Sequence, residues 1–149
     1  MSRVTVRITG DLGAAVEQIT AQIRHEMERR AYLAANELKN ASLDVLRGQR
    51  SGRRYRVPGT RRYYTASAPG EPPAVRTGTF RLSWQPKTRI DGDTYTSSIE
   101  SDISVGKYLL GELLEEGTTR GMAARPYKDR ILDQAEEKIV DIYSRPYDL

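Results

Sequence analysis

The side chains able to do chemistry are few in this chain. Its 149 residues include no cysteine and a single histidine, His25. This composition excludes disulfides, thiol nucleophiles, cysteine-based metal centres and multi-histidine metal sites. His25 stands between Arg24 and Glu26, and no motif ties it to a serine or an aspartate, so a catalytic triad is not expected. The sequence therefore predicts a protein that is not an enzyme, with no catalytic residue, no metal and no cofactor.

Three short motifs resemble parts of ligand-binding sites but are incomplete, and each has a simpler explanation. Glu112 and Glu115 fall on one helix face three residues apart. With Glu116 they predict an acidic interface, because no second carboxylate cluster or histidine accompanies them to complete a metal site. Residues 91–93 (Asp-Gly-Asp) lack the late glutamate of a calcium loop and predict a hairpin turn. Residues 117–121 lack the lysine of a phosphate-binding loop and predict a structural turn.

The strongest local signal is a group of arginines between residues 47 and 62, a window with no acidic residue. The chain as a whole carries a net charge of +4, so the remainder outside this window is mildly acidic. Glycine, proline and serine interleave with the arginines, and such a segment buries too little apolar surface to order itself. We therefore predict a long mobile loop over residues 47–75. Its candidate partner-contacting or DNA-contacting residues are Arg47, Arg50, Arg53, Arg54, Arg56, Arg61 and Arg62.

Two kinds of partner suit this arginine-rich segment. Arginine binds phosphate in a bidentate manner and tyrosine stacks on bases, which would suit nucleic acid. A polybasic segment also docks on an acidic protein or on a sister subunit. No helix-turn-helix, zinc-finger or RNA-binding sheet signature accompanies the arginines. The sequence alone leaves both partners open.

The first half of the chain predicts a strand and a long helix. Alternation of Val4, Val6 and Ile8 with polar residues predicts a short strand over residues 3–9, followed by Asp11 as a helix cap. From residue 12 to 47, apolar residues recur every three or four positions, and Gly48 is the expected C-terminal stop. The stripe is Val16, Ile19, Ile23, Met27, Ala31, Ala34, Leu38, Ala41 and Val45. It predicts either an ordinary core helix or one whose stripe packs partly on a neighbouring subunit.

The second half predicts antiparallel strands and two helices. Alternation around Phe80, Leu82 and Trp84 predicts a strand, and further strands are expected over residues 95–99 and near 103–105. Residues 108–116 predict a short helix that Gly117 ends. Pro126 suits the first turn of a last helix, which runs to about residue 143. We expect an α+β fold in one domain, residues 1–149: a small, mostly antiparallel sheet packed against a long N-terminal helix and a C-terminal helix, with a long arginine-rich loop.

Targeting signals are not expected. No run of about 18 apolar residues predicts a membrane span, and the first residues lack the pattern of a signal peptide. The absence of cysteine fits synthesis in a reducing cytoplasm.

Two stretches together resemble a known family. The first is ASAPGEPPAVRTGTFRLS at residues 66–83, and the second is LEEGT at 114–118 followed by GMAARPY at 121–127. They are similar to the neck and tail-completion proteins, the tail-component family, of long-tailed bacteriophages. Members carry a "SAPGEPP" element after a long N-terminal helix, and later "EFGT" and "MAARPF" before the last helix. Here Tyr127 stands at the phenylalanine position and Phe80 at a leucine position.

The resemblance implies a structural virion protein without catalysis. Such a protein is made in the cytoplasm of the host bacterium and forms a homo-oligomeric ring in the neck of the virion. It joins the completed head to the tail. Its partners would be the head-completion or portal-side proteins, the tail terminator or tail tube, and the genomic DNA that passes nonspecifically through the lumen; no membrane or small-molecule substrate is implied. Two alternatives remain, a tail terminator that caps the tail tube and a nonspecific nucleic-acid-binding protein that uses the arginine-rich loop.

Overall fold

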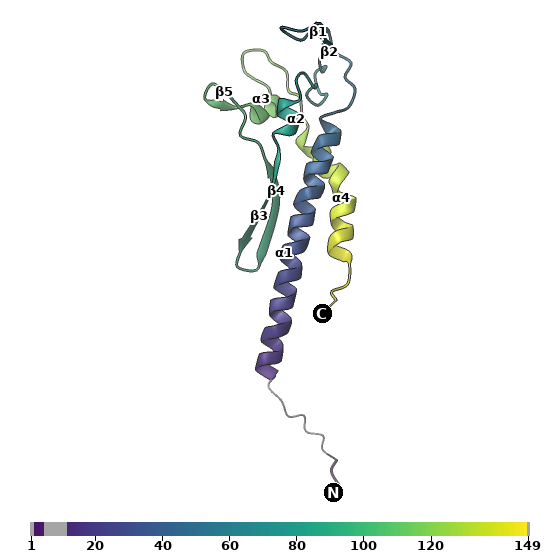
Figure 1. The fold of residues 1–149 in the computed structure, drawn as a ribbon, viewed down its shortest axis with the longest axis vertical. Coiled ribbons are helices and arrows are strands. Elements are labelled where there is room, and N and C mark those ends of the chain that lie inside the picture. The colour runs from purple at the N-terminus through teal and green to yellow at the C-terminus, as the bar shows by residue number, and fades with distance from the viewer. Residues whose placement is uncertain (1, 5–11, 149) are drawn as a thin grey trace.

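One long helix organises the molecule. In the computed structural model, which describes residues 2–4 and 12–148, helix α1 (Leu12–Val45) spans 34 residues, or about 50 Å. The β3–β4 hairpin packs along one side of α1, and helix α4 (Lys128–Ser144) packs along another (Figure 1). The α+β class is confirmed. Of the expected N-terminal elements, most of the 3–9 strand and the Asp11 cap lie outside the described residues.

The apolar stripe of α1 divides into a buried part and an exposed part. In the C-terminal half its alanines and leucines enter the core. In the N-terminal part every residue from 13 to 25 is exposed, because α4 has only 17 residues and does not reach this part of α1 (Figure 1). The exposed fractions are 61% for Val16, 46% for Ile19 and 37% for Ile23.

The strands are antiparallel, as predicted, but they form three separate hairpins and do not join in one sheet. Each hairpin pairs only with itself. In the longest, Gly92 has a φ of 59° at the turn that the sequence predicts. The strands are β1 (Arg54–Arg56) with β2 (Tyr63–Thr65), β3 (Gln85–Asp91) with β4 (Thr94–Glu100), and β5 (Ser104–Val105) with β6 (Tyr108–Leu109).

The strand predicted around Phe80 is also wrong, because residues 79–82 form the short helix α2 (Thr79–Leu82). Phe80 and Trp84 are four residues apart, and their rings meet at 5.6 Å in an edge-to-face arrangement. A strand would also place both rings on one face, because every second residue of a strand points the same way. Residues 80–84 alone therefore could not distinguish a strand from a helix.

Helix α3 (Leu110–Glu116) ends at Gly117, as predicted, with a φ of 76° that favours glycine. Pro126 precedes α4 by two residues and does not lie in its first turn, which corrects that prediction. Gly48 is likewise not a left-handed helix stop. Instead, Arg50 Nη2 donates to the carbonyl of Val45, the last residue of α1, at 2.7 Å.

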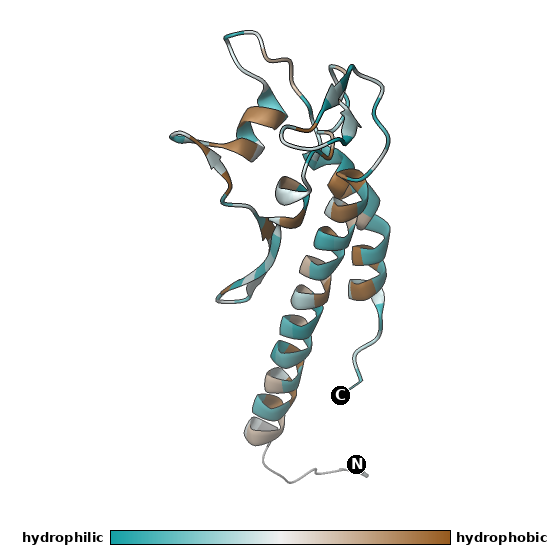
Figure 2. Cartoon of the chain, turned by 45° about the horizontal axis from the view of Figure 1, so that its top comes forward, coloured by the Kyte–Doolittle hydropathy of each residue, from teal (hydrophilic) through white to brown (hydrophobic). Residues whose placement is uncertain are grey.

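The core gathers around Tyr127, whose side chain is fully buried. Its ring meets Phe80 at 5.7 Å and Trp84 at 5.8 Å, and its hydroxyl donates to the Gly111 carbonyl at 2.8 Å. Burial raises the pKa of Tyr127 well above its usual range. Figure 2 shows hydrophobic residues on α3 and at the C-terminal end of α1, and Leu114 of α3 and Leu46, the residue that follows α1, belong to the core that surrounds Tyr127.

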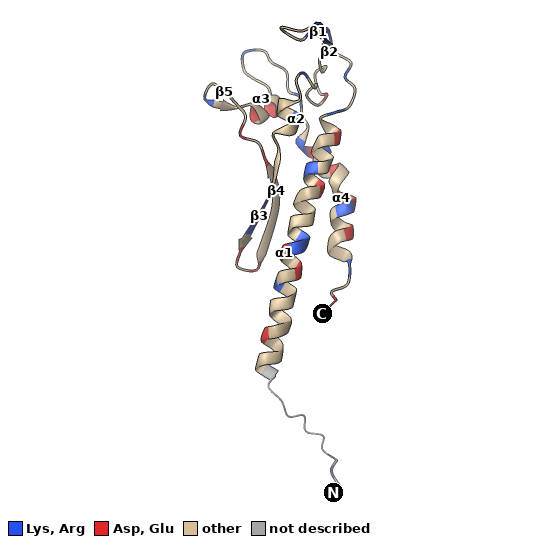
Figure 3. Ribbon diagram, in the orientation of Figure 1, with Lys and Arg blue, Asp and Glu red and all other residues tan. Residues whose placement is uncertain are grey.

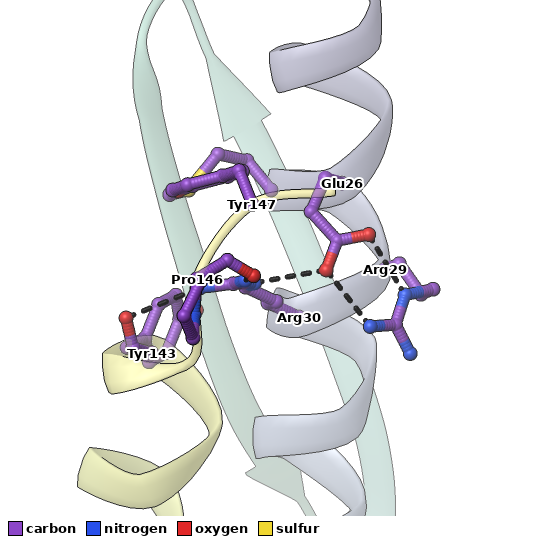
Figure 4. Close-up of polar contacts among 7 residues, drawn as sticks. Glu26, Arg29, Arg30, Tyr143, Pro146 and Tyr147 are labelled. Atoms are coloured by element: carbon purple, nitrogen blue, oxygen red, sulfur yellow. Dashed lines mark hydrogen bonds and ion pairs between the residues drawn. The ribbon is translucent and has the colours of Figure 1, made fainter. Parts of the chain in front are cut away.

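A buried arginine ties the C-terminal tail to α1. Arg30 is 1% exposed. Its guanidinium donates to the carbonyls of Tyr143 and Pro146, both at 3.1 Å, and to Glu26 at 2.9 Å (Figure 4). Hydrogen bonds from Arg29 and Arg30 lower the pKa of Glu26 to about 2. The buried Arg30 guanidinium therefore has three hydrogen-bond acceptors that compensate for its desolvation.

Candidate interaction surfaces

The arginine-rich segment contains an ordered hairpin. Residues 47–75 are therefore not one irregular loop, because β1 and β2 pair with Arg54 opposite Thr65 and Tyr55 opposite Tyr64. The amide of Val57 donates to the Arg62 carbonyl at 2.8 Å and closes the hairpin. The hairpin stands beyond the C-terminal end of α1 (Figure 1). Five of the predicted arginines are carried there, all exposed: Arg53, Arg54, Arg56, Arg61 and Arg62.

Aromatic rings hold some of these cations in place. The guanidinium of Arg54 lies 4.8 Å from the ring centre of Tyr63, and that of Arg53 lies 5.7 Å from that of Tyr55. Arg56 donates to the carbonyl of Thr60 at 2.7 Å. Within the described chain, none of the five hairpin arginines forms an ion pair with a carboxylate. Together with the exposed rings of Tyr55 and Tyr63, they form a cationic and aromatic surface, which we call the hairpin surface (Figure 3).

The other two predicted arginines differ from these. Arg50 is turned inward, and its guanidinium donates to the carbonyls of Val45, Pro72 and Pro73 at 2.7–3.2 Å. Desolvation by burial lowers its pKa. Arg50 therefore supports the fold by joining the end of α1 to the diproline segment. Arg47 is exposed and lies at the foot of the segment.

Glu71 fastens the base of the hairpin, a role that the sequence did not reveal. Its carboxylate accepts hydrogen bonds from the hydroxyl and amide of Ser51 and from the amide of Ala68. These hydrogen bonds lower the pKa of Glu71 to about 2. The contact joins two segments that lie 20 residues apart in the sequence, and no local sequence motif predicts it.

The three glutamates of the predicted acidic interface are used differently from one another. Glu115 accepts the amides of Tyr127 at 2.8 Å and Lys128 at 3.2 Å, so it caps the start of α4. Glu112 pairs with the ammonium of Lys128 at 2.7 Å. Glu116 is exposed and has no partner among the described residues. The three therefore do not form one free acidic surface.

An open apolar groove of about 620 Å³ lies between the two stretches that carry the phage resemblance. Its lining includes Val75 and Phe80 from the first stretch and Leu114 and Met122 from the second. The two stretches also touch directly, because the amide of Gly70 donates to the carbonyl of Ala124 at 3.2 Å. The two stretches thus build one corner of the fold.

His25 is exposed on the N-terminal part of α1. Residues 2–4 and 12–148 contain no group of three or more potential metal ligands. In the same residues, no helix has the length and apolar character to cross a membrane.

No family model, curated protein or solved structure matches the chain.

Proposed function

We propose that this chain is a structural subunit of a bacteriophage neck, where copies assemble into a ring that joins the completed head to the tail while DNA passes through the lumen. The observation that carries the proposal is the exposed apolar stripe on the N-terminal part of α1. Val16, Ile19 and Ile23 continue the buried stripe of the same helix, and the side chains of all three are exposed. A stripe of this kind is the surface that a neighbouring subunit covers.

This part of α1 also has few charged residues that could stabilise it as an isolated helix. Between residues 13 and 23 its only charged residue is Glu17, so ion pairs along the helix are absent there. Isolated helices shorter than about 12–15 residues are marginal in water even with favourable sequences. Contact with another copy would supply the tertiary packing that this half of the helix needs.

The resemblance adds to this argument. Its two stretches meet in space, and several of their residues have structural roles. The carbonyls of Pro72 and Pro73 accept hydrogen bonds from Arg50, and Gly117 ends α3. A structural role accounts for these residues without a catalytic site. The partners that we propose are further copies of the chain, the head-completion or portal-side proteins, and the tail terminator or tail tube.

Particles and a deletion test the proposal. Mass spectrometry of purified virions of the phage that encodes the chain is expected to find it in stoichiometric, multi-copy amounts. Deleting the gene is expected to leave full heads and normal tails unjoined. Absence of the chain from virions, together with normal joining in the deletion, would overturn the proposal. Overlong tails in the deletion would instead identify a tail terminator, which ends tail growth.

Nonspecific nucleic-acid binding is a second candidate function, favoured by the hairpin surface. Five exposed arginines without carboxylate partners, beside two exposed tyrosines, suit a phosphate backbone and unpaired bases. This function predicts affinity for duplex DNA that falls steeply with salt. Removal of the five arginines would abolish that affinity.

A further inference from the structure

The outer face of α4 has no partner among the residues that the structure describes. Its inner face enters the core through Ile131, Ala135 and Ile142. The opposite face carries acidic residues at spacings of three and four, with Val140 (56% exposed) among them and Leu132 (55% exposed) at the edge. Across the part of the chain that the structure describes, these acids form no ion pair or hydrogen bond: Asp129, Asp133, Glu136 and Glu137.

The basic residues of α4 are directed elsewhere and do not neutralise this face. Lys138 reaches Glu37 of α1 at 3.8 Å. Arg130 donates to the carbonyl of Gly70 at 3.2 Å, and Lys128 pairs with Glu112 on α3. The outer face of α4 is therefore a negative surface with two exposed apolar side chains.

The hairpin surface has the matching chemistry. Its arginines offer planar forks that bind carboxylates in a bidentate manner. Tyr55 and Tyr63 are 44% and 56% exposed, and tyrosine supplies contact area to aliphatic side chains such as Val140 and Leu132. Tyrosine and arginine are also the residue types enriched among the residues that dominate protein–protein binding energy.

We infer that the β1–β2 hairpin of one copy docks on the outer face of α4 of the next copy. This inference rests on the proposed ring. The hairpin stands beyond the end of α1, whereas α4 lies alongside α1 (Figure 1), and no described hydrogen bond or ion pair joins the two within one chain. Two different patches that meet between copies form a heterologous contact, and such contacts generate rings when the rotation closes.

A second copy explains more of the surface than a nucleic acid does. DNA would cover the arginines and leave the acidic face of α4 without a partner, and that face would repel phosphate. Docking between copies covers both surfaces in one contact. The acids that the hairpin meets are then those of α4, in place of the glutamates of α3, two of which already have partners within the chain.

Cross-linking tests this contact directly, since the chain has no cysteine of its own. The variant carrying Arg54→Cys and Glu136→Cys together, treated with a short bismaleimide in concentrated solution and in assembled particles, is expected to give a ladder of dimers and larger species. Each single variant should give no ladder beyond dimers. A control with Arg54→Cys and Glu116→Cys should give none, because Glu116 lies on α3. No ladder from the first variant in either sample would overturn the inference.

Charge reversal provides a readout that misfolding cannot imitate. Arg54→Glu with Arg56→Glu, and separately Asp133→Arg with Glu136→Arg, are each expected to reduce assembly about tenfold or more. All four changes in one chain should restore it. Failure to restore assembly, with duplex-DNA affinity lost in the first variant, would overturn the docking in favour of nucleic acid.

These outcomes separate the inference from the proposed function. A chain that is present in the neck but gives no ladder would overturn the docking alone. A ladder from purified chain that is absent from virions would support the docking and overturn the neck assignment.

Discussion

The guanidinium of Arg30, in helix α1, lies 4.2 Å from the ring centre of Tyr147, in the C-terminal tail. The same cation donates to two carbonyls at the end of α4 and in the tail. The C-terminal tail is therefore folded back on α1 by one buried charge. This arrangement explains why an arginine stands among the small residues of the α1 stripe.

Replacing Arg30 should release the tail. Arg30→Ala leaves the carbonyls of Tyr143 and Pro146 without their donor and removes one of the donors to Glu26. We expect a loss of about 2–4 kcal/mol in the free energy of unfolding. Urea denaturation measures the loss, and proteolysis should cut the tail faster. Arg29→Ala is the matched control, since Arg29 is exposed and pairs with the same glutamate. It should cost much less than Arg30→Ala, because exposed ion pairs contribute little to stability. Equal effects of the two variants would contradict the role of Arg30.

Gly111 and Tyr127 should be energetically coupled. A Cβ at Gly111 would lie 2.8 Å from the Tyr127 hydroxyl, so Gly111→Ala should destabilise by about 1–3 kcal/mol. Tyr127→Phe removes the hydrogen bond to Gly111 and should cost about 1 kcal/mol. In the double variant the overcrowding is relieved, and the summed loss should be smaller than additive by at least about 0.5 kcal/mol. A double-mutant cycle by chemical denaturation measures this, and strict additivity would contradict the contact.

Acid should weaken the base of the hairpin. The pKa of Glu71 falls from 4.5 to about 2 in the folded chain, so its ionised form is favoured by folding. The stabilisation is complete above about pH 4.5 and is lost as the pH falls toward 2. We expect Glu71→Gln to lower stability at pH 7 and to flatten the decline between pH 4.5 and 2. The urea midpoint measured across this range is the test.

Glu116→Gln is the control for that experiment, because Glu116 is exposed and has no partner in the described chain. Its stability should follow the wild type at every pH. Glu26 titrates in the same acidic range, so the Glu71→Gln curve should keep part of the decline. A Glu71→Gln curve parallel to the wild type throughout would show that Glu71 is not the group involved.

The exposed stripe of α1 should matter for assembly and not for the isolated chain. Ile19→Gln with Ile23→Gln should change the free energy of unfolding by no more than about 0.5 kcal/mol, because both residues are exposed. Incorporation of the variant into particles should fall. The control is Gln18→Ala with His25→Ala, two exposed residues on the side of the helix away from the stripe, and this variant should assemble normally. Normal incorporation of the isoleucine variant would remove the main support for the ring.

The parts of the fold that could be predicted are those that local sequence determines. The long helix, the turn at Gly92 and the end of α3 at Gly117 each follow from residues a few positions apart. Arg30 could not be predicted, because its acceptors in the tail lie up to 116 residues away. A helical pattern shows that a charged residue lies on the apolar side, but it does not show what meets it there.

The sequence predicted which segment carries the candidate interaction surface, but it did not predict how the side chains of that segment are arranged. Charge density singled out the arginine-rich segment, yet nothing local distinguishes the inward Arg50 from its exposed neighbours. Its acceptors are carbonyls of Pro72 and Pro73, 22 and 23 residues later. Glu115 shows the same limit, since it caps a helix that begins 13 residues after it. The free acids of α4 became visible only once the pairing of its basic residues was known.

Imaging of the virion neck at residue resolution tests the central claim most directly. The account predicts a closed ring of copies of this chain between head and tail, with the Val16, Ile19 and Ile23 stripe of α1 covered by a neighbour. It also predicts the arginine hairpin of each copy against α4 of the next. A neck that contains no copy of the chain, or contains isolated copies whose α1 stripe faces solvent, would contradict it.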